Sequence, residues 1–211
     1  NSLRFRSSAS AYLSRTPGSA GNQQKFTLNI PIKRGSLGGT NCVFFAGAGG
    51  STWFGLQFNT SNQLALVATS GGSTVIDLVT TAVYRDPSAW YLVTLAVDTT
   101  NATAANRVLI YVNGVSQALN ISTSPAQNQS LAVNSTVIHT FGVLNYASTN
   151  YFDGYMAEIN FIDGQALDPS AFGFTSGITG SWAPKPYQGT YGTNGFRLNF
   201  SNGTSTTTLG Y

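Results

Sequence analysis

The sequence predicts an all-β protein, built as a two-sheet antiparallel jelly-roll sandwich. On the order of a dozen short apolar segments, rich in aromatic and β-branched residues, alternate with Gly, Asn, Asp and Pro turn signals. No segment shows the 3.6-residue periodicity of a helix of normal length. The segments also do not repeat at a fixed period, which argues against a propeller or a β-helix.

The first half of the chain predicts short strands joined by tight turns. Two apolar segments separated by the four polar residues 59–62 predict a hairpin, and Gly71-Gly72 predicts the next turn. Cys42 lies in a short apolar run, which is typical of a small buried core residue. The predicted strands of this half are residues 3–5, 11–13, 26–30, 42–46, 53–58, 64–67 and 75–79.

The second half continues the pattern around one long apolar run, residues 90–98, which predicts a central strand. Asn113-Gly114 is the strongest short hairpin signal in the chain. Asp168 followed by Pro169 predicts a capped helical turn. The remaining predicted strands are residues 106–112, 115–121, 133–143, 155–162 and 195–200.

Residues 151–167 are the most informative stretch of the sequence. Asp153-Gly154 and Asp163-Gly164 are turn signals, and the eight residues between them, 155–162, alternate with period two. They predict one uninterrupted strand with one face in a core. Tyr155, Ala157, Ile159 and Phe161 are expected on one face, and Met156, Glu158, Asn160 and Ile162 on the other.

Length and composition favour one domain over residues 1–211, with residues 173–211 as a C-terminal segment packing on it. Only 8% of the residues are charged, so solubility rests on neutral hydroxyl and amide groups. The net charge of +3 reflects few acids, and no basic stripe develops, so we expect no nucleic-acid binding. No apolar run approaches the roughly 18 residues of a membrane span. Because the chain begins at Asn1, we expect it to be processed or a piece of a longer protein.

Counting residues argues against enzymatic activity. The chain has one His and one Cys, too few for the roughly four ligands of a structural zinc site. His139 lies within a predicted strand and is expected to be a hydrogen-bonded strand residue. Glu158 is the only glutamate, and its neighbour two residues on is Asn160, so no strand carries the paired carboxylates of a retaining glycosidase.

Four stretches, taken in order, resemble the laminin G-like and pentraxin-like modules of the concanavalin A-like jelly rolls. They are residues 2–5, 90–98, 107–115 and 152–159. Three further runs resemble lectin-like domains of bacteriophage virion structural proteins, namely residues 161–167, 182–185 and 191–196. The resemblance covers nearly the whole chain and is specific for the fold, whereas one scaffold of this kind serves many partners.

This resemblance implies a non-enzymatic protein on the virion exterior, a tail fibre or a capsid decoration protein, assembled in the bacterial cytoplasm. Its expected partners are other virion proteins, copies of itself in a homo-oligomer such as a trimer, and a glycan on the host surface. An alternative is a purely architectural capsid or tail protein that binds no sugar. A third, less favoured, is a divergent glycosidase in which Asp153 and Asp168 approach each other.

Glycan binding requires aromatic faces and amide or hydroxyl groups side by side. The loop that contains Tyr146, Asn150 and Tyr151 supplies both kinds of group, and Trp53 follows a glycine-rich loop, although it also suits the sandwich core. We take these four residues as the glycan-binding candidates, with Tyr187 and Tyr191 as further aromatic candidates.

Calcium is the one candidate cofactor, because related modules bind it through loop aspartates and carbonyls. Asp86, Asp98 and Asp153 are loop-adjacent acids, but they also suit turn capping, and no dense acidic loop such as D-x-D-x-D occurs. We therefore assign no metal ligands.

Overall fold

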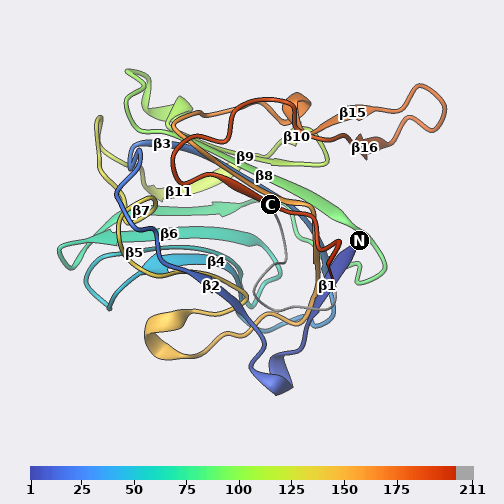
Figure 1. Cartoon of the computed structure of the whole chain (residues 1–211), viewed down its shortest axis with the longest axis horizontal. Helices are drawn as coiled ribbons and strands as arrows, with labels where there is room; N and C mark the ends of the chain where they lie inside the picture. The colour runs from blue at the N-terminus through green and yellow to red at the C-terminus, as the bar shows by residue number, and fades with distance from the viewer. Residues whose placement is uncertain (203–211) are drawn as a thin grey trace.

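In the computed structural model two antiparallel sheets stack face to face, which confirms the predicted jelly-roll sandwich (Figure 1). The structure describes residues 1–202, so the end of the predicted C-terminal segment, residues 203–211, lies outside it. A small hairpin of β15 (Gly173–Thr175) and β16 (Trp182–Pro184) projects beyond the sandwich. Across residues 1–202, no helix has the length and apolar character needed to cross a membrane.

The two large sheets have eight and seven strands. The eight-stranded sheet contains β1 (Ser2–Phe5), β3 (Lys25–Arg34), β8 (Tyr91–Asp98), β9 (Val108–Val112), β10 (Val115–Ser116), β13 (Gly154–Ala157), β14 (Ile159–Asp163) and β17 (Phe196–Leu198). The seven-stranded sheet contains β2 (Leu13–Arg15), β4 (Asn41–Gly47), β5 (Trp53–Phe58), β6 (Leu64–Ser70), β7 (Ser73–Thr80), β11 (Leu119–Thr123) and β12 (His139–Phe141). Residues 1–202 also form four short 3-10 turns, η1 (Ser7–Ala9), η2 (Ala104–Asn106), η3 (Asn145–Ala147) and η4 (Pro169–Ala171).

One hydrophobic cluster fills the space between the sheets. Strand β3 shows why: alternate residues Phe26, Leu28 and Ile30 are fully buried in this cluster, while the residues between them face outward. Strands β5 and β6 contribute from the other sheet in the same way. Each fully buried side chain of this size contributes about 1.5–3 kcal/mol relative to exposure. The apolar alternation in the sequence therefore sets which face of each strand forms the core.

The predicted turns are confirmed where their chemistry is specific. Asn113 and Gly114 both have positive φ, 52° and 77°, as the two-residue hairpin between β9 and β10 requires. Gly71 and Gly72 turn β6 into β7 in the same way. The Asp168 side chain caps η4 by accepting from the Ser170 N–H, with proline at the start of the turn.

Three predicted strands differ from the structure in extent or position. Residues 115–121 do not form one strand, because the chain passes from the eight-stranded sheet to the seven-stranded sheet between Ser116 and Leu119. Within 133–143 only His139–Phe141 is a strand. Asn134, within this range, has a φ of 62°, and its side chain donates to the Asn22 carbonyl and to Asp163. This backbone conformation is incompatible with regular strand pairing at Asn134. The predicted strand 11–13 lies two residues later, as β2.

The strand predicted over residues 155–162 is interrupted at Glu158, whose φ of 42° separates β13 from β14. Such an irregularity changes which residues face inward. Met156 is fully buried before the break, whereas Ile159 and Phe161 enter the core after it. The predicted common face of 155, 157, 159 and 161 is therefore wrong, and Tyr155 is 39% exposed.

His139 and Cys42 are buried structural residues, as predicted. The His139 Nε2 atom accepts from the Asn134 N–H at 3.0 Å, which leaves Nδ1 to donate to the Val137 carbonyl at 2.8 Å. Burial lowers the pKa of His139, so the ring is held neutral. Burial also raises the pKa of the Cys42 thiol, which keeps it unreactive.

Asp163, at the end of β14, is buried and joins three separate parts of the chain. Its carboxylate accepts from the Asn22 N–H at 2.8 Å, the Asn134 Nδ2 at 3.0 Å and the Asn194 N–H at 3.0 Å. The Asp163-Gly164 turn was predicted from the sequence, but the burial of the aspartate was not. A buried carboxylate needs such donors, because desolvation of its charge is costly without them.

Gly21 provides the first testable prediction. A Cβ atom at Gly21 would lie 2.1 Å from the Asp163 Oδ2 atom and 2.8 Å from the Asn194 Nδ2 atom. We expect Gly21→Ala to disturb this cluster and lower the free energy of unfolding by about 2–3 kcal/mol, measured by urea denaturation. Gly18→Ala is the matched control, since a Cβ at Gly18 meets nothing within 4 Å. Equal stability of both variants would contradict this role for Asp163.

Candidate functional site

Trp53 and Tyr146, two of the four predicted glycan-binding residues, lie in contact on the outer face of the seven-stranded sheet. Their ring centroids are 5.9 Å apart, and both rings pack on Phe45, at 6.2 Å and 5.8 Å. Phe45 itself is fully buried, whereas Tyr146 is 44% exposed. We call Phe45, Trp53 and Tyr146 the aromatic platform.

Two glycines make room for the platform. A Cβ atom at Gly47, opposite Trp53 on the neighbouring strand, would lie 2.6 Å from the Trp53 Cβ atom. A Cβ at Gly55 would approach the Trp53 ring to 3.1 Å. The indole therefore lies flat over the sheet beside Gly55 instead of standing away from it.

Polar side chains share this outer face. Gln57 lies two residues from Gly55 on the same strand and therefore faces the same side. The register also aligns Gly55 with Val67 on β6, and Val67 with Asp77 on β7, so Asp77 faces this side as well. With neighbouring strands about 4.8 Å apart, Asp77 lies about 10 Å from Gly55. Among residues 1–202 the Asp77 carboxylate has no ion-pair or hydrogen-bond partner. The aromatic rings, the two glycines and the polar side chains of Gln57 and Asp77 therefore share this face of the sheet.

The other two predicted residues, Asn150 and Tyr151, anchor the loop through their backbones. The Asn150 carbonyl accepts from the Cys42 N–H at 2.8 Å, and the Tyr151 carbonyl accepts from the Asn41 Nδ2 at 3.4 Å. These bonds fix the loop that carries Tyr146 against β4. The structure therefore groups Trp53 with Tyr146 and gives Asn150 and Tyr151 a positioning role through the main chain.

A second candidate surface, which the sequence reasoning missed, lies on the outer face of the eight-stranded sheet. The register aligns one polar residue from each of five neighbouring strands in a single row across β17, β14, β3, β8 and β9. The row runs Arg197, Asn160, Asn29, Thr94, Tyr111. Within each strand this is one polar residue among apolar neighbours, a weak signal that only the register makes visible.

The C-terminal segment covers one end of this polar row and forms with it a partly open pocket of about 210 Å³. Asn29 and Asn160 lie in it, together with Glu158, Arg197 and Lys185. The Arg197 Nε and Nη2 atoms both donate to the Glu158 Oε2 atom, at 2.9 and 2.8 Å. We call this site the C-terminal pocket.

Tyr187 and Tyr191, the further aromatic candidates, do not belong to the platform. They contact residues that line the C-terminal pocket. Their rings are 5.2 Å apart in an edge-to-face arrangement, and Tyr187 packs on Phe172 at 5.2 Å. The Tyr191 hydroxyl donates to the Asn160 Oδ1 atom at 2.9 Å. These tyrosines therefore hold the C-terminal segment on the sheet.

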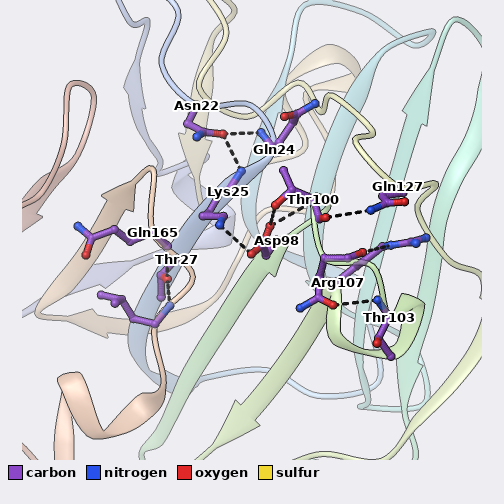
Figure 2. A network of polar contacts seen from close by, with 12 residues as sticks. Asn22, Gln24, Lys25, Thr27, Asp98, Thr100, Thr103, Arg107, Gln127 and Gln165 are labelled. Atoms are coloured by element: carbon purple, nitrogen blue, oxygen red, sulfur yellow. Dashed lines mark hydrogen bonds and ion pairs between the residues drawn. The ribbon is translucent and has the colours of Figure 1, made fainter.

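The acids that suggested calcium are bonded within the protein and are separated from one another. Asp98 pairs with Lys25 at 2.9 Å and accepts from Thr100 within the network of Figure 2. Asp153 pairs with Arg4 at 2.5 Å and accepts from Ser7. These two acids flank opposite ends of β3, about 30 Å apart.

Residues 1–202 contain no group of three His, Cys, Asp or Glu side chains that could hold a metal ion. The carboxylates that would serve a glycosidase are also engaged separately. Glu158 is paired with Arg197, Asp153 with Arg4, and Asp168 caps η4.

The two-sheet sandwich defines a lectin-like β fold. The chain belongs to the Concanavalin A-like lectin/glucanases superfamily, whose family model matches residues 7–171. A comparison with curated protein sequences found no match.

Solved structures share the fold at low sequence identity. The CBM40 of the Ruminococcus gnavus IT-sialidase has a TM-score of 0.52 at 15% identity, over 75% of this chain and 95% of that chain. The SAP-like pentraxin of Limulus polyphemus has a TM-score of 0.52 at 13% identity, over 74% and 70%. Domain 4 of the arabinanase AbnA from Geobacillus stearothermophilus has a TM-score of 0.53 at 19% identity, over 71% and 65%, so this chain spans about two thirds of that one.

The pairing of Asp153 with Arg4 predicts an acid-sensitive contribution to stability. Burial acts to raise the pKa of Asp153, but the hydrogen bonds from Arg4 and Ser7 and the Arg4 charge outweigh it and lower the pKa below its ordinary value. A lowered carboxyl pKa stabilises the folded state above the unfolded pKa, about 3.9, and this stabilisation is lost as the pH falls through the folded pKa.

We expect Asp153→Asn to lower the free energy of unfolding at pH 7 by about 1 kcal/mol. The difference from wild type should shrink toward pH 2, as measured by urea denaturation at several pH values. Asp77→Asn is the control, because the Asp77 carboxylate makes no ion pair or hydrogen bond within residues 1–202. A loss for Asp153→Asn that is the same at pH 7 and pH 2 would contradict this assignment.

Proposed function

We propose that this protein is a non-enzymatic surface protein of a bacteriophage virion, a tail fibre or a capsid decoration protein, which attaches to glycans on the host surface. The observation that carries the glycan-binding part is the aromatic platform, in which Trp53 and Tyr146 present adjacent rings beside free polar groups. Aromatic faces take up the C–H faces of sugars, and polar groups bond their hydroxyls.

Two of the similar structures support a sugar ligand by their descriptions. One is the CBM40 of a sialidase, and the other is an arabinanase domain in complex with arabinotriose. The proposal of no catalysis is supported by the single glutamate, whose carboxylate is paired with Arg197. The bacteriophage context rests on the resemblance of residues 161–167, 182–185 and 191–196 to virion proteins.

The architectural alternative is favoured by the hairpin of β15 and β16. The loop between its two strands carries Ile178, which is 96% exposed, and Phe174 within β15 is 50% exposed. Apolar side chains on a projecting hairpin suit contacts with other virion proteins or with copies of this chain in a homo-oligomer, for which we propose a trimer. In that case the platform would bind no sugar.

A glycan array separates the two functions. We expect the wild-type protein to bind a subset of host-surface glycans, and Trp53→Ala or Tyr146→Ala to weaken that binding at least tenfold, or about 1.4 kcal/mol. Trp90→Ala is the matched control, because Trp90 is also exposed, at 43%, and lies outside the platform.

Each array is run with calcium and with a chelator, which tests the calcium prediction separately. Loss of binding in the chelator would support a bound calcium ion. A folded wild-type protein that bound no glycan in either condition would remove the lectin function and leave the architectural one.

A further inference from the structure

The C-terminal pocket has the construction of a binding site separate from the aromatic platform. Its floor is the polar row of the eight-stranded sheet, where Asn29 and Asn160 are only 2% and 5% exposed. The Asn29 Nδ2 atom donates to the Thr94 Oγ1 atom at 2.9 Å, but its Oδ1 atom accepts no hydrogen bond within residues 1–202. The Asn29 Oδ1 atom therefore remains available in the pocket as an acceptor for a ligand donor.

In the neighbouring Asn160, by contrast, both amide atoms have hydrogen-bond partners in the protein. The Asn160 Nδ2 atom donates to the Glu158 carbonyl at 2.8 Å, and its Oδ1 atom accepts from the Tyr191 hydroxyl. Asn160 is thus held rigidly by the protein, while Asn29 retains an acceptor. A ligand hydroxyl is the donor that fits this position.

The walls of the pocket are apolar. Pro31 and Leu92 come from the sheet, and Phe172, Pro184 and Pro186 come from the C-terminal segment. Flat aliphatic and aromatic walls suit the C–H faces of a sugar ring. A pocket of about 210 Å³ exceeds the space of a few waters and has room for one sugar unit.

The charges of the pocket do not balance. Glu158 is matched by Arg197, which leaves the Lys185 ammonium group without an ion-pair partner among residues 1–202. Lys185 is exposed, and its own N–H donates to the Phe172 carbonyl at 2.8 Å, which positions it beside an apolar wall. The pocket therefore has one net positive charge, contributed by Lys185, and favours an anionic group.

We propose that the C-terminal pocket binds one acidic sugar unit. A hydroxyl of the sugar donates to the Asn29 Oδ1 atom at the floor, its ring packs on the apolar walls, and its carboxylate accepts from the Lys185 Nζ atom. This site is independent of the platform, because it lies on the outer face of the other sheet.

The test is an NMR titration of the full chain with galacturonate and, separately, with galactose. We expect galacturonate to bind at least tenfold more tightly than galactose, and Lys185→Gln to remove that preference while leaving galactose binding unchanged. Lys33→Gln is the matched control, because Lys33 lies on β3 outside the pocket and makes no ion pair with a described residue.

Trp53→Ala provides the second comparison and is expected to leave galacturonate binding intact. Loss of galacturonate binding in Trp53→Ala would place the acid on the platform and overturn the proposal. Equal affinities for galacturonate and galactose, an unchanged preference in Lys185→Gln, or no binding of galacturonate by the folded protein would each overturn it as well.

Discussion

The carboxylate of Asp163 is the interaction on which the arrangement of the chain ends depends. It bonds the loop that leads into β3, the loop before β12 and the loop before β17, segments that are otherwise distant in sequence. The main chain of Asp163 also donates to the Tyr191 carbonyl. Holding Asn194 in this way places β17 beside β14, and β17 carries Arg197. The position of Arg197 in the pocket thus depends on a buried acid that does not line the pocket.

The fold was largely predictable because its signals are local. The Asn113-Gly114 turn and the apolar alternation of β3 each depend on a few adjacent residues. The failures have a different origin. Nothing adjacent to Glu158 marks the break in its strand, and the passage from β10 to β11 depends on which sheet each strand joins, which is a tertiary property.

In the candidate sites, too, local residue chemistry was predictable and tertiary contacts were not. Residue chemistry identified Trp53 and Tyr146, but their contact depends on Gly47 and Gly55, whose small size matters only once the strands are in register. The polar row was invisible beforehand, since Asn29 and Asn160 are 131 positions apart and meet only through the pairing of β3 with β14. Sequence patterns identify residue types, whereas register decides which of them meet.

Strand β3 has a consequence for how the protein is made. It pairs on one side with β8 and on the other with β13 and β14. The second edge of β3 therefore cannot pair fully until the chain has been synthesised as far as Asp163. At roughly 5–20 residues per second, a ribosome needs on the order of ten seconds to supply them. During that time an apolar strand has an open edge, and unpaired edges of this kind invite association with other chains. Synthesis speed and chaperone access are therefore constraints on the yield of this sandwich that its finished structure does not display.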